Sequence, residues 1–346
     1  MTAAGDGGHD PVYPVRRNSR AFALEPDTAM GRQAVTHADT DASEPPDEEA
    51  LWRAVLADPG AAARCPRLSA TRAWALYGPI LAADRPFVVA QLGQSLDGRV
   101  ATVDGASQYI NGSAALDHLH RLRASVDAVL VGVGTVLSDD PQLTVRRCFG
   151  ANPVRVVVDA RARLPSDARC LSGEAPLIVV RGPDGLTADI GETIRVPRRA
   201  DGLLDPVAIV AALAARGLRR ILVEGGATTV SHFLEAGVVD RLHVAVAPLL
   251  IGSGIAGLKL APVASLDAAM RPPTAVYVLD DGNVLFDCDI AAARSRSGRL
   301  QNDTADDLSA VGADAALDDR DLRPRRDPPR DRHGAGAVGA DAEHAL

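Results

Sequence analysis

The chain has 346 residues, a hydrophobic fraction of 47% and a formal net charge of −8. That length allows one or two domains, and the negative charge argues against a general affinity for nucleic acid, which needs a basic face. There is no uninterrupted apolar run of about 18 residues, so no membrane span is expected, and the N-terminus lacks a basic and then apolar signal sequence. The four cysteines are scattered and form no CxxC pair, which indicates a reduced, cytoplasmic protein.

Composition divides the chain into a central domain and flanking segments. Residues 1–45 contain few large apolar side chains and are predicted to be disordered, as is the tail 291–346, which mixes charges with proline. Between 46 and 84, Leu51, Trp52 and Val55 recur at helical spacing, which predicts a short helical extension packed on the following domain. A role for this extension in binding a partner or a second copy stays open.

Residues 85–290 alternate strand and helix patterns and are predicted to form one domain. Apolar runs predict strands at 87–92, 128–131, 154–158, 177–180, 221–224, 242–250, 275–279 and 284–289. Helices are predicted at 113–125, at 206–215 and directly after Gly226. The Asp-Gly pair at 281–282 predicts a hairpin between the last two strands. The expected fold class is therefore α/β, a mostly parallel central sheet with helices on both faces and an antiparallel C-terminal hairpin.

Two glycine turns are candidates for binding a phosphorylated ligand. Gly225 and Gly226 end a buried strand and allow the backbone to approach a ligand closely, while the next helix would present N–H groups that suit a phosphate. A packing role alone is an equal alternative. The earlier turn at 132–134 also follows a strand, but Leu137 stands where G-x-G-x-x-G requires its third glycine. A standard Rossmann domain is therefore not expected.

The order of several separated motifs is more specific than either turn. Over residues 85–290 the chain resembles the reductase domain of riboflavin biosynthesis, a member of the dihydrofolate-reductase-like superfamily. The motifs that carry the resemblance are SLDGR at 95–99, GASQYI at 105–110, HRLR at 120–123, VGVGTVL at 131–137, SDDPQLTVR at 138–146, VEGGAT at 223–228, LEAGVVD at 234–240 and APLLIG at 247–252.

The resemblance implies a set of ligand contacts without assigning a catalytic side chain. The implied substrate-binding residues are Ser107, Arg123, Leu143, Arg146 and Glu224. The implied cofactor-binding residues are Gly93, Tyr109, Thr135, Asp139, Gly226, Ala227, Thr228, Thr229, Val230, Ser231 and His232. An arginine fork suits a sugar phosphate, although surface arginines are commonly only solvated. Helix capping would explain Thr135 and Asp139, and the helix dipole would explain Glu224.

The chain departs from the family pattern at three positions. Tyr109 stands where the family commonly has a tryptophan beside the cofactor, and another aromatic ring preserves a flat wall. The family strand often carries a lysine two residues before the position of Gly93; here Gln91 lies in the neighbouring slot and no lysine occurs there, which puts the usual substrate in question. Ala160 replaces a serine of an Asp-Ser motif, so one hydroxyl contact with the cofactor is lost. We hypothesise that Arg161, Arg163 or Arg181 contacts the 2′-phosphate of NADPH instead.

The resemblance implies an NADPH-dependent, homodimeric reductase that converts the ribosyl group of a ribosylaminopyrimidine 5′-phosphate into a ribityl chain. Bifunctional relatives also carry a zinc deaminase, but these residues contain neither H-x-E nor P-C-x-x-C, so we expect no deaminase activity. No metal site is expected. Two alternatives stay open: a reductase of the same fold that acts on another pterin-like or secondary-metabolite heterocycle, and a non-catalytic dinucleotide-binding protein.

Overall fold

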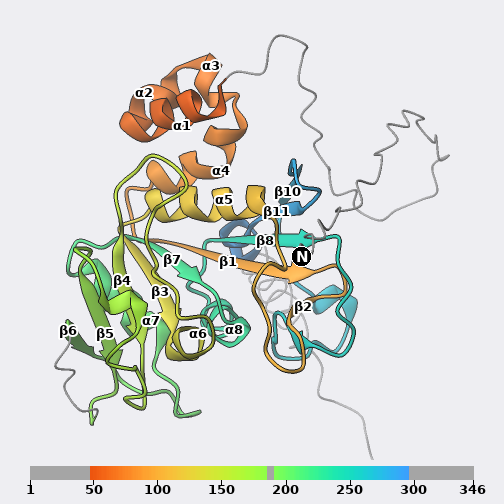
Figure 1. The fold of residues 1–346 in the computed structure, drawn as a ribbon. Coiled ribbons are helices and arrows are strands. Elements are labelled where there is room, and N and C mark those ends of the chain that lie inside the picture. Colours follow the sequence, from red (N-terminus) through yellow and green to blue (C-terminus); the bar gives the residue numbers. More distant parts are fainter. Residues whose placement is uncertain (1–46, 185–190, 296–346) are drawn as a thin grey trace, which may run out of the picture. The chain divides into compact units, whose positions relative to one another are not determined.

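The computed structural model describes residues 47–184 and 191–295. Within these residues the central feature is a nine-stranded sheet of order β10-β11-β8-β1-β7-β3-β4-β5-β6 (Figure 1). Strands β8 to β6 in this order pair in parallel, whereas β11 runs antiparallel to both β8 and β10. This confirms the predicted mostly parallel sheet with an antiparallel C-terminal hairpin. The strands are β1 (Phe87–Ser95), β3 (Ala128–Gly132), β4 (Val154–Val158), β5 (Leu177–Arg181), β6 (Glu192–Arg195), β7 (Arg220–Glu224), β8 (Arg241–Ala247), β10 (Thr274–Val278) and β11 (Val284–Asp289).

Both faces of the sheet are buried, which is why its central strands are rich in valine, leucine and isoleucine. Successive side chains of a strand point to opposite faces, so Val129 and Val131 of β3 join one core while Leu130 joins the other. Helix α5 (Ser113–Ala124) covers the first face. Helices α7 (Pro206–Ala214) and α8 (Ala227–Glu235) cover the second (Figure 1).

The structure departs from the predicted strands at three places. Strand β8 ends at Ala247 rather than 250, because Pro248 has no N–H group for the ladder. Strand β6 was not predicted, since it is a short edge strand with charged ends. A separate two-stranded sheet joins β2 (Arg99–Ala101) to β9 (Ile255–Ala256). These pieces are too short for hydrophobic alternation to identify them.

Four helices precede the sheet in the described chain: α1 (Glu48–Ala57), α2 (Pro59–Arg64), α3 (Pro66–Ser69) and α4 (Arg72–Leu81). We call these helices the extension. They belong to the same compact unit as the sheet, Met1–Ile290, while Ala291–Leu346 form a second unit. The segments predicted to be disordered, 1–45 and 291–346, lie outside the described residues except for 291–295, which are helical.

A buried polar chain anchors the extension to the sheet. The Tyr77 hydroxyl lies 2.8 Å from His118 Nδ1, and His118 Nε2 lies 3.0 Å from Nδ1 of His243. His243 Nε2 is 3.1 Å from Asp287 Oδ1, which also pairs with Arg241. Burial, followed by the neighbouring His243, lowers the pKa of His118 well below its ordinary value. The chain can run in one direction, with the Tyr77 hydroxyl donating to His118 and the Nε2 atom of each histidine directed toward Asp287.

Candidate active site

The two glycine turns interlock at the carboxyl ends of β3 and β7. Helix α6 (Val133–Asp139) starts directly after Gly132, and α8 starts after Gly226. A Cβ atom at Gly226 would lie 2.8 Å from Thr135 Oγ1, and one at Gly132 would lie 2.5 Å from Thr229 Oγ1. Gly225 and Gly226 also have φ of 71° and 41°, which glycine adopts most readily. Each turn thus needs glycine, and each places its threonine against the other turn.

The start of α8 is open to an anion. Its N-cap, Gly226, has no side chain that could accept a hydrogen bond. In the described part of the chain, the N–H groups of Ala227 and Thr228 have no acceptor. Val230 and Ser231 are buried, and the Ser231 hydroxyl accepts the Lys259 N–H at 2.8 Å. Of the predicted cofactor contacts at residues 226–232, we therefore keep those in the first turn of α8. His232, further along the helix, is half-buried and stays a candidate.

Arg123 and Glu224 form a buried ion pair. Arg123 Nε donates to Glu224 Oε2 at 2.9 Å, and Nη2 donates to the other carboxylate oxygen. Arg123 Nη1 donates to the Thr144 carbonyl at 2.9 Å. The two residues are 5% and 7% exposed. The Arg123 guanidinium, and not a helix dipole, is thus the group that stabilises the Glu224 carboxylate. Arg123 also links the end of β7 to the loop after α6.

The loop after α6 carries several of the predicted residues. The Ser107 hydroxyl donates to Asp139 at 2.8 Å, while Asp140 accepts the Arg169 N–H at 2.7 Å. Asp139, the last residue of α6, therefore binds the loop that carries Ser107 and caps no helix start. The adjacent carboxylates of Asp139 and Asp140 bind different partners. Leu143 has φ of 57° and a buried side chain, so only its backbone is available to a ligand. Positive φ at a non-glycine residue is uncommon and concentrates at functional sites.

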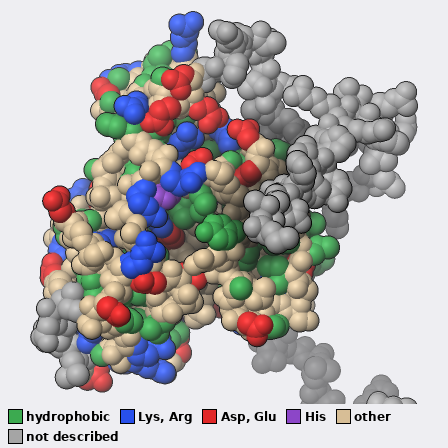
Figure 2. Space-filling view, in the orientation of Figure 1, with side chains coloured by type: hydrophobic (Ala, Val, Ile, Leu, Met, Phe, Trp, Pro, Cys, Tyr) green, Lys and Arg blue, Asp and Glu red, His purple; other side chains and the backbone are tan. Residues whose placement is uncertain are grey.

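Arg146 and Arg147 of this loop are both exposed, and Arg147 pairs with Asp117 of α5. The Arg146 N–H donates to His120 Nδ1 at 2.9 Å, and Arg146 Nη1 donates to Thr144 Oγ1 at 2.6 Å. Burial, followed by the charges of Arg123 and Arg146, lowers the pKa of His120 to about 4, so the ring is neutral with its proton on Nε2. Figure 2 shows Lys and Arg side chains and a histidine gathered beside a hollow on this face. Because Arg123 is paired with Glu224, Arg146 is the better placed of the two for a phosphate.

Asn111, in the segment before α5, lies against the end of β1 and was not identified from the sequence. A Cβ at Gly93 would lie 2.0 Å from Asn111 Oδ1. The Asn111 amide donates to the Ala245 carbonyl at 3.1 Å and to Asn283 at 2.9 Å. Tyr109, in the same loop, has φ of 67° and is 87% exposed. Gly93 is thus required for packing under Asn111, and only the three-dimensional approach of these segments could show it.

Gln91 is the other unusual group on β1. It lies in register with Glu224 of β7 and with His243 of β8. Its side chain is 7% exposed and makes no hydrogen bond within the described residues. A nearly buried amide that bonds to no described residue and lies in register with Glu224 is a candidate for contact with a ligand.

The three arginines proposed for the 2′-phosphate separate in the structure. Arg181 is buried and lies 3.3 Å from the buried Asp159. Arg161 and Arg163 follow β4 and are exposed. Asp159 also accepts the Arg163 N–H at 2.8 Å, which fixes this turn. Arg161 and Arg163 are therefore better candidates than Arg181 for contact with the 2′-phosphate.

No group of metal-ligating side chains occurs among the residues that the structure describes.

Residues 86–266, just over half of the chain, match the family model of the RibD C-terminal domain. The chain belongs to this family. It is 38% identical over 174 residues to the 2,5-diamino-6-ribosylamino-4(3H)-pyrimidinone 5′-phosphate reductase of Methanothermobacter thermautotrophicus, covering 49% of this chain and 80% of that protein. It is 37% identical over 190 residues to the riboflavin biosynthesis protein RibD of Mycobacterium tuberculosis, covering 54% of this chain and 49% of RibD. A solved structure of Acinetobacter baumannii RibD gives a TM-score of 0.52 at 28% identity, covering 65% of this chain and 63% of that chain.

The chain thus spans about half the length of the curated RibD proteins that it matches. Its fold is the dihydrofolate-reductase-like fold of RibD-type reductases. All the site residues predicted from the resemblance lie inside the matched RibD C-terminal domain, whereas the extension lies outside it.

Proposed function

We propose that this chain is an NADPH-dependent reductase of riboflavin biosynthesis that acts on a ribosylaminopyrimidine 5′-phosphate. One observation carries the proposal. Arg123 bonds to Glu224, directly before the glycine turn proposed for the cofactor, and to Thr144, in the loop that carries Arg146. A single side chain therefore holds the two proposed half-sites together. The names of the relatives from Methanothermobacter and Mycobacterium, a pyrimidinone 5′-phosphate reductase and a riboflavin biosynthesis protein, agree with this chemistry.

The residues of the interlocked turns fit a dinucleotide. The open start of α8 suits a pyrophosphate, because its N–H groups and partial positive charge favour an anion. Thr135 presents a hydroxyl next to Gly226, and any side chain at that glycine would fill the space. Arg161 and Arg163 are exposed at the end of β4 and would distinguish NADPH from NADH. When bound, the nicotinamide supplies the hydride.

The substrate contacts follow from charge and burial. Arg146 is exposed and offers its fork to the phosphate. Glu224, held by two bonds to Arg123, offers carboxylate oxygens to sugar or pyrimidine donors. Gln91 contributes an amide in register with Glu224. The protein's contribution to hydride transfer is to fix the sugar carbon against the cofactor, since positioning supplies much of the rate enhancement in such reactions.

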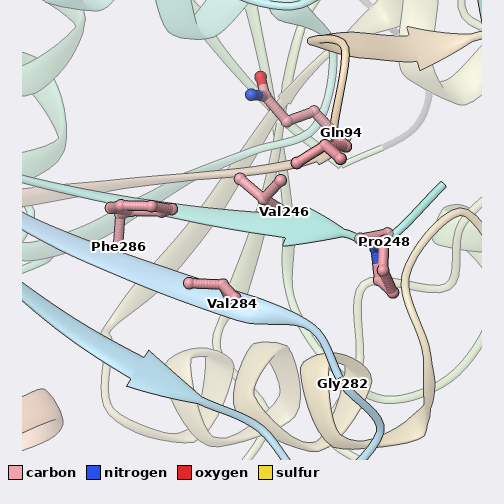
Figure 3. Close-up of a pocket in the computed structure, with 8 residues that line it drawn as sticks. Gln94, Val246, Pro248, Gly282, Val284 and Phe286 are labelled. Atoms are coloured by element: carbon pink, nitrogen blue, oxygen red, sulfur yellow. The ribbon is translucent and has the colours of Figure 1, made fainter. Parts of the chain in front are cut away.

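We also propose that two copies of the chain associate. An apolar cavity of about 330 Å³ opens at the ends of β1, β8 and β11, where Val246, Pro248 and Phe286 lie with Gln94 and Val284 (Figure 3). Leu96, which also lines the cavity, is 64% exposed, and Leu250 is 71% exposed. Exposed apolar patches of this kind mark interfaces.

No described helix has the length and apolar character needed to cross a bilayer. The described cysteines are all unpaired, which supports a cytoplasmic location.

The decisive experiment follows absorbance at 340 nm with NADPH or NADH and a panel of substrates. The panel contains 5-amino-6-(5-phosphoribosylamino)uracil, its 2,5-diamino-pyrimidinone counterpart, their dephosphorylated forms and pterins. We expect turnover of a phosphorylated ribosylaminopyrimidine with NADPH. Turnover of another heterocycle alone would favour the alternative that Gln91 and Ala160 motivate. Binding of NADPH without turnover of any substrate would support the non-catalytic alternative.

Arg146→Met gives a matched test of the phosphate contact. The variant should raise KM for the phosphorylated substrate by at least tenfold and leave KM for the dephosphorylated form unchanged. Equal effects on both KM values would remove Arg146 from the phosphate site.

We assign no deaminase activity to these 346 residues, and incubation with the deaminase substrate should release no ammonia.

A further inference from the structure

The loop that carries Arg146 is held at both ends. At its start, Arg123 bonds the Thr144 carbonyl and His120 accepts the Arg146 N–H. In its middle, Arg147 pairs with Asp117 of α5 at 2.6 Å. Its far end, Phe149 and Gly150, reaches α1 of the extension. The loop therefore runs along α5 from the proposed substrate site to the extension.

Three side chains of α1 hold Phe149, and we call this contact the Phe149 clamp. Trp52, fully buried, donates its Nε1–H to the Phe149 carbonyl at 2.8 Å. The Arg53 guanidinium lies 4.6 Å from the centre of the Phe149 ring, a cation–π geometry. Glu49 accepts the Phe149 N–H at 3.4 Å. Both backbone polar groups of Phe149 and its ring are thus bound by one helix.

The next residue confirms how closely the loop is enclosed. Gly150 has φ of 149°, and a Cβ there would lie 2.5 Å from Ala124 Cβ and 3.4 Å from Leu56 Cδ2. The loop therefore passes between α5 and α1. Because α1 lies outside residues 86–266, the clamp is built by a segment that the RibD C-terminal domain model does not include.

We propose that the extension is a positioning element for substrate binding, and that Trp52 acts through Phe149 to preset the loop that presents Arg146. A loop ordered before binding loses less conformational entropy when the phosphate arrives. The clamp should therefore lower KM for the phosphorylated substrate and leave kcat and the KM for NADPH nearly unchanged. This inference rests on the proposed function, since it assigns the loop to that same substrate.

The test compares Trp52→Phe and Arg53→Ala with Tyr77→Phe. Trp52→Phe removes the bond to the Phe149 carbonyl. Arg53→Ala removes an exposed side chain that packs on the Phe149 ring. Tyr77→Phe keeps the ring that packs against Trp52 and removes only the hydroxyl bond of the extension to His118, so it serves as the control. We expect a five- to tenfold rise in substrate KM for Trp52→Phe, a two- to threefold rise for Arg53→Ala, and less than a twofold change for the control.

Hydrogen exchange at the amides of residues 144–150 provides a second readout that needs no turnover. Exchange should accelerate in both clamp variants and stay unchanged in Tyr77→Phe. The inference is overturned when substrate KM and loop exchange are unchanged in both clamp variants, or when the control moves them equally. Absence of turnover by the wild-type protein refutes the proposed function, and loop exchange alone then decides whether the clamp orders the loop.

Discussion

Replacing Arg123 with methionine tests the ion pair on which the site depends. The variant leaves the 7% exposed Glu224 carboxylate without its two bonds and removes a donor from the Thr144 carbonyl. Removing one partner of a buried pair costs about 3–5 kcal/mol. In a domain of this size, 1 kcal/mol corresponds to about 2–4 °C, so Tm should fall by roughly 10 °C. Glu224→Met should cost a similar amount, because it leaves the guanidinium unpaired.

The double variant Arg123→Met/Glu224→Met should recover most of the lost stability, within about 1 kcal/mol of the wild type, because a buried pair is often replaceable by apolar groups. Urea unfolding of the four proteins, followed by circular dichroism at pH 7, closes the cycle. The reasoning fails if each single variant loses less than about 1 kcal/mol, as a solvated surface pair would. Turnover then shows what the ion pair does. A stable but inactive double variant means that the charges of Arg123 and Glu224 act on the substrate, whereas an active one means that they serve only folding.

Three further predictions concern other parts of the site. Gln91→Met should change the free energy of unfolding by less than about 1 kcal/mol, because the Gln91 side chain makes no hydrogen bond to another described residue, while kcat/KM falls at least tenfold. A larger loss of stability would contradict this. Gly226→Ala should cost about 1–2 kcal/mol for the left-handed backbone alone and weaken NADPH binding measured by fluorescence, and an unchanged Kd would exclude this turn. Burial lowers the pKa of His118 and His120, so the unfolded chain binds more protons below pH 6.5 and stability should fall on acidification. For His120 this window reaches down to about pH 4, with a slope of up to about 1.4 kcal/mol per pH unit for each ring. Urea midpoints at pH 5 and 7 should differ less in His120→Gln than in the wild type, and equal differences would refute the assignment.

Local chemistry was sufficient to predict most of the elements. The valine-rich runs of β3, β4 and β5 bury their side chains only if both faces of the sheet are covered. The glycine pair after β7 predicts the turn into α8. The hairpin at 281–282 follows from one Asp-Gly pair. Strands β6 and β9 were missed because edge strands this short carry no measurable periodicity. The end of β8 was placed three residues late because the apolar run continues past Pro248.

The sequence by itself determined which segments form strands and helices, where the glycine turns lie and which family motifs the chain carries, because each of these depends on neighbouring residues. Only the tertiary structure decided which partner each side chain meets. Arg123 is paired with a carboxylate 101 positions away, Asn111 covers Gly93, and Trp52 holds a carbonyl 97 positions along the chain. Such contacts depend on how the chain returns to itself across the sheet, and no local pattern of hydrophobicity or charge encodes that path.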